Sequence, residues 1–541
     1  MQVVPFLERN ACLLAILLTV FGSARIVATY TVFNHTFDEP MHIACGMEWL
    51  DKGTYTCEPQ HPPLARAAAA LGPYLSGIRS QGIATRNLYT QPREGIAILY
   101  SGNHYERTLA LARLGILPFF WIACAVVYVW GRRYFNGTLA VLAVFFFSFT
   151  PPVLAHAGLA TTDMAVTAFL GASFLAGLVW VERPNARRAL WFGLCTGLAV
   201  LSKFTALVYL PAAVVVVFVW YWATGHKGIG KATAARWPSF VLAVGTGAVV
   251  VWAGYRFSFG AVDFTSIHLP APELYAGIEN VLRHNSQGHW SYLLGERSPL
   301  GFWYFYPVVL AVKTPLALLA LGLYGAVLAF RENTGLPLLW IPLCFAAAIL
   351  QVAMMGHINI GVRHVLPMYI GISILAGAAA LKLIEAGRTW KAAGITVAAL
   401  VAWFAGSSLF SHPDYIAYFN ELAGSQPEKI LVDSDLDWGQ DIKRAAARLH
   451  QLGVREVAFP QFIVADLEKQ HGFPHLSPEV DSIRQPSGYF LAGATFWKAF
   501  HFGLEADQAV WPDHVPPRER IGKGMFLWYR PSGPREPAGT P

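Results

Sequence analysis

Charged residues are scarce in this sequence, and their scarcity excludes most soluble folds. Of its 541 residues, 13% are Asp, Glu, Lys or Arg, whereas 55% are hydrophobic. Soluble domains carry roughly 25% charged residues. The composition therefore indicates a polytopic membrane protein. We interpret the net charge of +7 as a sign of membrane topology, and we expect no nucleic-acid partner.

Cysteine is also sparse, with six residues and no CxxC pair. The missing pairs exclude a zinc ribbon and a thioredoxin-like redox motif. Four of the six lie in apolar runs, where we expect them to be packing residues. Cys45 and Cys57 lie in a more polar stretch, and their spacing of twelve residues allows a disulfide without requiring one.

Long apolar runs, in contrast, recur along the first 410 residues. A membrane span needs about 20 apolar residues. We predict eleven spans: 11–31, 108–130, 138–154, 164–181, 189–202, 205–223, 238–256, 314–330, 336–355, 368–386 and 394–410. The first run has no clear small-residue cleavage site, so we expect a retained span rather than a signal peptide. The fifth runs almost directly into the sixth at LSKFTA, where we expect a tight re-entry.

Basic residues indicate the orientation of these spans, because cytoplasmic loops are enriched in Lys and Arg. With the N-terminus in the cytoplasm, the basic loops fall on the inner side: 131–133, 182–188, 225–237, 330–332 and 381–391. The long loops 32–107 and 257–313 then face outward, as does the chain after 411. We predict a bacterial inner-membrane protein whose site and C-terminal domain are periplasmic or extracellular.

The outer segments have predicted structure of their own. PMHIACGMEWLDKG and PPLARAAAALGPYLSGI have the spacing of helices that lie along the membrane face. KILVDSDLDWGQDIKRAAARLHQLGVREVAFPQ has a strand–helix–strand pattern, and SGYFLAGATFW and GKGMFLWYR read as further strands. We therefore divide the chain into a membrane domain (1–410), a small α/β domain (411–530) and a disordered tail (531–541).

Unusual polar residues fall at the outer ends of the predicted spans. They are Asp38, Glu39, Asp163, Lys203, Arg363 and His364. Few charges lie in the middle of a span, where an ion pathway would need them. This distribution predicts a site at the outer membrane boundary.

The chemistry available at that boundary limits what the site does. The outer compartment of a bacterium-like cell lacks nucleotide sugars, so a sugar donor used there arrives attached to lipid. A polyprenyl-phosphate sugar needs a carboxylate that deprotonates an acceptor hydroxyl, and cations that hold the departing phosphate. The phosphate is a good leaving group, so no general acid is required. The polar residues of the outer boundary match this demand.

Several motifs carry a family resemblance. FDEPMH, HPPLAR, GRRYFNGTLAVLAVFFFSFTPPVLAHAGLATTDMAV and LAVLSKFTAL, in this order, resemble the bacterial phospholipid-carrier-dependent glycosyltransferases, relatives of the protein O-mannosyltransferases and the aminoarabinose transferases of lipid A. YLLGERSPLGFWYFYPVVLAVKTPL, NIGVRHVLPMY and HPDYIAYFNELAG with LVDSDLDWGQD resemble one bacterial branch. The resemblance covers about residues 30–450 and implies the GT-C fold, with catalytic residues in the first outer loop. No WWD motif is present, and DWGQ does not replace it, so glycosylation of Asn sequons is not expected.

The resemblance also implies roles for the acidic residues. Asp38 is then the catalytic base, Glu39 its partner in acceptor or metal binding, and Asp163 a support of the same pocket. The structural alternatives are a helix start for Asp38 and Glu39, and an N-cap for Asp163. Glu39 and His42 lie three residues apart on a predicted helix and are close enough to share a divalent metal ion, the one cofactor we consider.

The basic residues are expected to face the carrier phosphate. Lys203 contacts it from one side and the Arg363–His364 pair from the other, with His61 and Arg107 as further pocket residues. The alternatives are a snorkelling lysine and interfacial anchors. We expect Lys313 to be an interfacial anchor as well. For DSDLDWGQD, we prefer a strand-end turn that caps the next helix to a Ca²⁺ site.

These observations predict an inverting glycosyltransferase. It moves a sugar from a polyprenyl-phosphate donor to a hydroxyl of a protein, lipid or polysaccharide acceptor, in contact with membrane lipids. Two other classes stay open: a transporter or flippase of lipid-linked substrates, which predicts inverted repeats, and a non-catalytic scaffold. The sequence indicates neither the sugar nor the acceptor.

Overall fold

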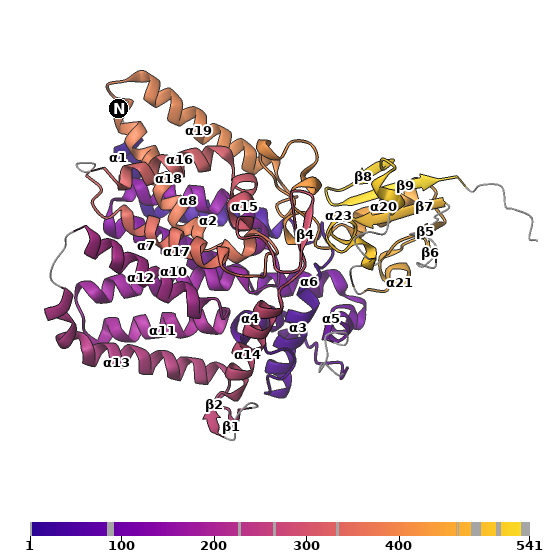
Figure 1. The fold of residues 1–541 in the computed structure, drawn as a ribbon, viewed down its shortest axis with the longest axis horizontal. Coiled ribbons are helices and arrows are strands. Elements are labelled where there is room, and N and C mark those ends of the chain that lie inside the picture. The colour runs from indigo at the N-terminus through magenta and orange to yellow at the C-terminus, as the bar shows by residue number, and fades with distance from the viewer. Residues whose placement is uncertain are drawn as a thin grey trace, which may run out of the picture.

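Helices make up most of the chain in the computed structural model (Figure 1). The structure describes residues 3–83, 91–224, 229–262, 267–331, 335–460, 463, 465–477, 488–504 and 510–531. The expected disordered tail, apart from residue 531, lies outside the described residues.

The first half of the chain contains helices from the N-terminus to residue 254. They are α1 (Val3–Arg9), α2 (Ala11–Val27), α3 (Glu39–Met47), the π-helical turn η1 (Glu48–Lys52), α4 (Pro63–Leu75), α5 (Gln91–Tyr100), η2 (Ser101–Asn103), α6 (Tyr105–Leu114), α7 (Leu117–Tyr134), α8 (Gly137–Phe149), α9 (Pro151–Ala157), α10 (Asp163–Glu182), α11 (Ala186–Ser202), α12 (Ala206–Ala223) and α13 (Ile229–Gly254).

The second half adds short strands and further helices before the C-terminal sheet. They are β1 (Phe259–Ala261), β2 (His268–Pro270), α14 (Pro272–Gln287), β3 (Ser291–Leu293), β4 (Glu296–Ser298), α15 (Phe305–Lys313), α16 (Leu316–Ala329), α17 (Trp340–Met354), η3 (Val362–Val365), α18 (Met368–Ala386) and α19 (Lys391–Phe410). The C-terminal elements are η4 (Glu421–Ala423), η5 (Pro427–Lys429), η6 (Asp433–Asp435), α20 (Ile442–Gln451), β5 (Glu456–Ala458), α21 (Leu467–His471), β6 (His475–Leu476), β7 (Gly488–Gly493), α23 (Ala494–Lys498), η7 (His501–Gly503), η8 (Trp511–Asp513), β8 (Glu519–Ile521) and β9 (Met525–Arg530).

The membrane body is confirmed, but the expected number of eleven spans is not. Within the described residues, six helices are long and apolar enough to cross a membrane, and eight if each of two bent pairs is one span. α8 and α9 bend by 66° where Pro151 and Pro152 interrupt the helical hydrogen bonds. α15 and α16 bend by 118° at Thr314–Pro315, so the span expected from residue 314 begins at this bend. The expected tight turn at LSKFTA is confirmed, since α11 ends at Ser202 and α12 begins at Ala206.

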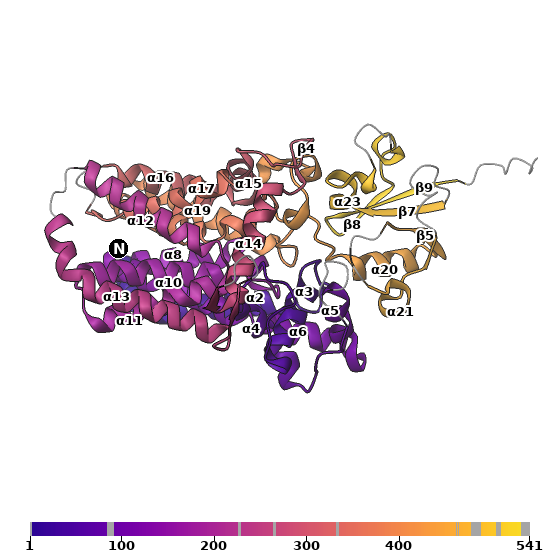
Figure 2. The ribbon, with the colours of Figure 1, turned by 60° about the horizontal axis from the view of Figure 1, so that its bottom comes forward.

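The membrane helices form a bundle, and the elements expected on the outer side lie together at one end of it. In Figures 1 and 2, the helices α3 to α6 and the yellow sheet lie at that end, and the N-terminus lies at the opposite end. α14 runs across the bundle in Figure 1. This arrangement brings segments from four distant parts of the chain to one end of the bundle.

The C-terminal sheet has five strands in the order β6-β5-β7-β9-β8. β5 is parallel to β6 and β7, whereas β7 pairs with β9 in antiparallel register, with Leu491 opposite Leu527. The small α/β unit is therefore present. The first expected strand, at KILVD, is wrong: η5 and η6 cover residues 427–429 and 433–435. Leu431 and Trp438 pack into the core of the membrane body instead of the sheet.

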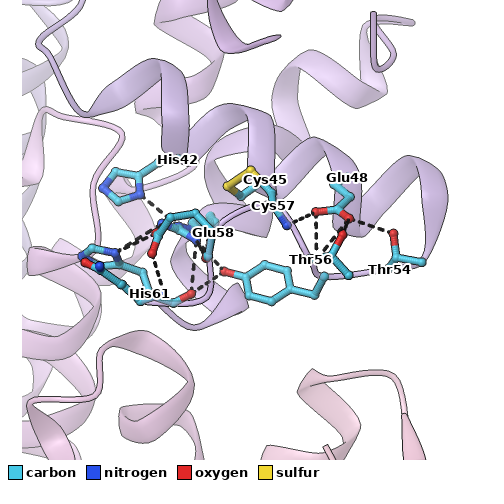
Figure 3. The surroundings of a disulfide bond; sticks show 11 residues. His42, Cys45, Glu48, Thr54, Thr56, Cys57, Glu58 and His61 are labelled. Atoms are coloured by element: carbon cyan, nitrogen blue, oxygen red, sulfur yellow. Dashed lines mark hydrogen bonds and ion pairs between the residues drawn. A yellow bond between two sulfur atoms is a disulfide. The ribbon is translucent and has the colours of Figure 1, made fainter. Parts of the chain in front are cut away.

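The two helices expected in the first outer loop are confirmed as α3 and α4. They approach closely at Gly46, where a Cβ would come within 1.9 Å of the carbonyl oxygen of Arg66. A disulfide joins Cys45 of α3 to Cys57, whose Cα atoms lie 5.3 Å apart (Figure 3). Glu48 binds the same segment through Thr54 Oγ1 at 2.9 Å and the backbone N–H of Cys57 at 2.8 Å.

The disulfide is expected to stabilise this loop. Replacing both Cys45 and Cys57 by Ser should destabilise the protein by about 2–4 kcal/mol, because the unfolded loop gains conformational entropy. Thermal unfolding of the detergent-solubilised protein, followed by tryptophan fluorescence, measures the change. Cys12→Ser, at an exposed cysteine, is the control. An unchanged melting temperature in the double variant would contradict the prediction.

Candidate functional site

A cavity of about 350 Å³ lies where the outer segments meet the end of the bundle. Its lining comes from the start of α3, from the residues just before α4, from the α11–α12 turn, from α14, from the residues around η3 and from the C-terminal segment. Of the residues singled out in the sequence, Asp38, His61, Lys203, Arg363 and His364 line this cavity. The structure therefore brings together side chains that are more than 300 residues apart.

Asp38 and Arg363 form an ion pair in the cavity wall. Arg363 Nη1 donates to Asp38 Oδ2 at 2.8 Å, and Arg363 is buried. The guanidinium carbon lies 4.2 Å from the centre of the Trp438 ring, in a cation–π contact. Burial alone would lower the pKa of Arg363, but the nearby carboxylates of Asp38 and Asp163 outweigh it and raise this pKa. Arg363 is thus a fixed cation.

Lys203 and Asp163 form a second ion pair. Lys203 follows the last residue of α11 in extended conformation, and its Nζ donates to Asp163 Oδ1 at 2.6 Å. Asp163 is the first residue of α10, and the preceding N-cap residue, Thr162, makes no side-chain cap. Since Asp163 is buried and paired, it supports Lys203 from behind the cavity. Lys203 itself is 8% exposed, which does not fit a lysine that snorkels to water.

Glu39 points away from the cavity. It is fully buried and accepts hydrogen bonds from Arg113 Nε and Nη2, both at 2.8 Å. The backbone N–H groups of Thr36 and Ala160 donate to the same carboxylate at 2.8 and 2.9 Å. Burial would raise the pKa of Glu39, but Arg113 and these donors hold it below its ordinary value. Glu39 therefore joins α3 to α6 and to the residues before α10.

His42 and His61 belong to a network around Arg66. Arg66 Nε donates to His42 Nδ1 at 3.0 Å, and the guanidinium forms an ion pair with Glu58. Glu58 Oε2 lies 3.2 Å from His61 Nδ1, which places the ring of His61 at the cavity wall (Figure 3). Burial lowers the pKa of both histidines, so both are neutral at pH 7.

Glu39 and His42 bind different partners. This geometry therefore does not favour the expected metal ion shared by the two side chains. Within the described residues, no three His, Cys, Asp or Glu side chains are grouped so that they could hold a metal ion.

Two other expected residues lie outside the cavity lining. Arg107 is exposed on α6. Lys313 is not an interfacial anchor: it is 1% exposed, and its Nζ donates to the backbone carbonyl oxygens of Ile416 at 2.7 Å and Asp435 at 2.5 Å. Lys313 therefore attaches the C-terminal segment to the membrane body.

Several cavity residues were not predicted from the sequence, and four of them matter for the chemistry of the site. They are His284, His289, Asp433 and Trp438. His284 Nε2 lies within hydrogen-bond distance of His289 Nδ1, at 3.2 Å, and burial lowers the pKa of both. The sequence signal for these two cavity residues was a pair of histidines five residues apart in a long loop. DSDLDWGQD was noted but interpreted as a helix cap, whereas Asp441 at the start of α20 makes no side-chain cap.

The cavity lining combines two cations with four histidines. Lys203 and Arg363 are its cations, each paired with a carboxylate, and His61, His364, His284 and His289 have pKa values lowered by burial. A phosphate group that enters can replace a carboxylate as the partner of a cation. The carboxylate of Asp38 is then available to accept a proton.

Comparison with known proteins concerns the family and the fold of the chain. Residues 111–232 match the family model of dolichyl-phosphate-mannose-protein mannosyltransferase, so the resemblance stated from the motifs is confirmed there. No curated protein sequence matches the chain.

Solved structures extend the likeness to the whole chain. The structure of ArnT from Cupriavidus metallidurans bound to undecaprenyl phosphate superposes with a TM-score of 0.50 at 14% identity, covering 95% of this chain and 97% of that one. Its apo state gives 0.48 at 13% identity over the same shares. AglB from Archaeoglobus fulgidus, in complex with an inhibitory peptide and a dolichol-phosphate, gives 0.44 at 12% identity, covering 90% and 70%. The likeness to the undecaprenyl-phosphate complex of ArnT shows that the chain has an ArnT-like fold.

Proposed function

We propose that this chain is a glycosyltransferase that moves a sugar from a polyprenyl-phosphate donor to an acceptor hydroxyl at the outer face of a bacterial inner membrane. The observation that carries the proposal is one cavity in which Asp38, Lys203 and Arg363 meet. A base and two cations are the groups that this reaction needs. The family match over residues 111–232 and the ArnT-like fold support the same reaction class.

The donor phosphate binds between Lys203 and Arg363. Both cations lie in the cavity wall and already hold a carboxylate at 2.6 and 2.8 Å. An Arg guanidinium and a Lys ammonium bind phosphate oxygens with charge-assisted hydrogen bonds. His364 lies in the same wall and is neutral, so its ring contributes a hydrogen bond instead of a charge.

Asp38 is the base of the proposed reaction. When the donor phosphate binds Arg363, Asp38 no longer accepts a hydrogen bond from Arg363. The carboxylate oxygen that accepted this bond can then accept a proton. The Asp38 carboxylate accepts the proton of the acceptor hydroxyl, the acceptor oxygen bonds to the anomeric carbon, and the carrier phosphate leaves with the electrons of the broken bond. A single displacement of this kind inverts the anomeric configuration.

Two features support the proposed outer-face location. The N-terminus and the C-terminal sheet lie at opposite ends of the bundle (Figures 1 and 2). The disulfide between Cys45 and Cys57 lies in the first outer loop, and disulfides persist in oxidising compartments such as the periplasm.

The proposal is tested with membranes that contain the overproduced protein and a panel of radiolabelled polyprenyl-phosphate sugars. Transfer of label from one donor, absent from membranes without the protein, establishes the reaction class. The anomeric configuration of the product tests the displacement, because retention of the donor's configuration would overturn it. If no donor in the panel loses its label, the proposed function is overturned for these donors.

Lys203→Gln tests the phosphate site. Gln keeps a hydrogen bond to Asp163 but removes the charge, so we expect undecaprenyl phosphate to bind about 10-fold or more weakly, the effect of losing one charge-assisted hydrogen bond of about 1.5–3 kcal/mol. Binding to the purified protein is measured by native mass spectrometry. Lys443→Gln is the control, since Lys443 pairs with Glu106 and does not line the cavity. If wild type and Lys203→Gln bind undecaprenyl phosphate with equal affinity, Lys203 is not part of the phosphate site.

A further inference from the structure

A second carboxylate enters the cavity from the C-terminal part of the chain. The acidic side chains in the cavity lining are Asp38 and Asp433. Asp433 begins η6, and its backbone is left-handed, with φ at 58°. This conformation is uncommon for a residue other than glycine, and it persists where the surrounding structure imposes it, commonly at functional sites.

Contacts on both sides impose the conformation of Asp433. Its backbone N–H donates to Thr495 Oγ1 at 2.8 Å, at the start of α23. The next residue, Ser434, donates through its hydroxyl to the carbonyl oxygen of Ile360 in the cavity wall. Ser434 N–H also donates to Asp433 Oδ1 at 2.5 Å. The segment is thus fixed between the C-terminal sheet and the residues before η3.

The neighbouring carboxylates have another role. Asp435 and Asp437 are buried and accept hydrogen bonds from backbone groups: Val362 N–H donates to Asp435 at 3.1 Å, and Gly439 N–H donates to Asp437 at 3.1 Å. Asp433 is half-buried and faces the cavity. Among the described residues, Ser434 is the one that donates hydrogen bonds to its carboxylate. A carboxylate offers about four acceptor positions, so Asp433 retains capacity for a ligand.

The charge of Asp433 limits what that ligand is. The pKa of Asp433 is raised to about 6, because burial, with a smaller contribution from Asp38, outweighs the opposing effect of Arg363. Asp433 is therefore mainly ionised at pH 7, and an ionised carboxylate accepts hydrogen bonds but donates none. It repels a phosphate and favours a hydroxyl. The donor phosphate has its cations in Lys203 and Arg363, so a hydroxyl group is the ligand that suits Asp433.

We propose that Asp433 binds the acceptor: its carboxylate accepts a hydrogen bond from a hydroxyl of the acceptor and holds the nucleophilic oxygen beside Asp38. This inference rests on the proposed glycosyl transfer. It predicts that the acceptor is an uncharged, hydroxyl-bearing group, and that the C-terminal segment is part of the acceptor site.

Asp433→Asn tests the proposal. Asn tolerates the left-handed conformation and has the same shape, so the variant removes the charge and leaves the backbone in place. Membranes receive the labelled polyprenyl-phosphate sugar that the wild type uses, and two products are followed: label in the acceptor and label released as free sugar by water. Binding of undecaprenyl phosphate to the purified variant is measured in parallel. Asp466→Asn is the matched control, because Asp466 caps α21 and Asn caps a helix equally well.

We expect Asp433→Asn to reduce transfer to the acceptor at least 10-fold, while the release of free sugar and the binding of undecaprenyl phosphate stay within twofold of wild type. Transfer equal to wild type would overturn the proposal. A parallel loss of undecaprenyl phosphate binding would also overturn it, because it would assign Asp433 to the donor site or to stability. Absence of transfer by the wild type itself would overturn the proposed function, and with it this inference.

Discussion

Replacing Asp38 by Asn is expected to reduce sugar transfer by about 10²–10⁴-fold, the usual contribution of a positioned general base. Asn keeps the shape of the side chain but cannot take the proton of the acceptor hydroxyl. The variant also frees Arg363 from its ion partner at 2.8 Å. We therefore expect undecaprenyl phosphate to bind Asp38→Asn as tightly as wild type or more tightly, while turnover of the labelled donor is lost.

The opposite changes in binding and turnover distinguish a base from a structural residue. Asp51→Asn, also in the first outer loop, is the matched control, because Asp51 contacts Arg79 outside the cavity. Turnover of Asp38→Asn close to that of wild type would show that Asp38 is not the base. Loss of both binding and turnover would indicate a misfolded loop.

Glu39→Ala is expected to destabilise the protein by about 3–5 kcal/mol, because it leaves Arg113 buried without its counter-ion. Arg113 is 1% exposed and donates two hydrogen bonds to Glu39. The double variant Glu39→Met with Arg113→Met removes both charges and is expected to recover part of the lost stability, because the backbone N–H groups of Thr36 and Ala160 still lose their acceptor. Melting temperatures of the purified proteins in detergent provide the comparison.

This prediction separates Glu39 from its neighbour Asp38, although the two residues are adjacent in the sequence. If Glu39→Ala melts like wild type but transfers no sugar, Glu39 belongs to the reaction and not to the scaffold. Glu106→Ala serves as the control, since Glu106 is an exposed residue whose ion pair with the half-buried Lys443 is open to solvent, and such pairs contribute about 0–1 kcal/mol.

The sequence pointed to polar residues that the structure places around one cavity, but it did not indicate how they pair. Asp38, Lys203 and Arg363 stand at the ends of apolar runs, and the cost of charge inside a bilayer makes such positions informative. The partner of Glu39 was not predicted, because Arg113 is 74 residues away and lies inside an expected span. A charge within an apolar run needs a buried partner. The position of Arg113 was therefore the sequence signal for a buried ion pair.

The C-terminal contribution to the site was harder to predict. The run DSDLDWGQD is polar, and polar runs most often form exposed turns and caps. Its burial depends on contacts with Ile360, Val362 and Lys313, which are between 70 and 125 residues away and have no local signature. The two bends were not predicted either, since 138–154 and 314–330 were expected as spans, but Pro151–Pro152 and Pro315 were the available signals because proline interrupts helices.

The position of Asp433 and Trp438 has a consequence for biosynthesis. Both lie in the last quarter of the chain, after every predicted span, yet they close the cavity around Arg363 and Asp38. A ribosome-bound chain that has inserted all its membrane helices still has an open, incomplete cavity until this segment has been synthesised and has docked. For the proposed transferase, catalytic competence is then one of the last events of synthesis, and we expect truncated or stalled chains in the membrane to transfer no sugar.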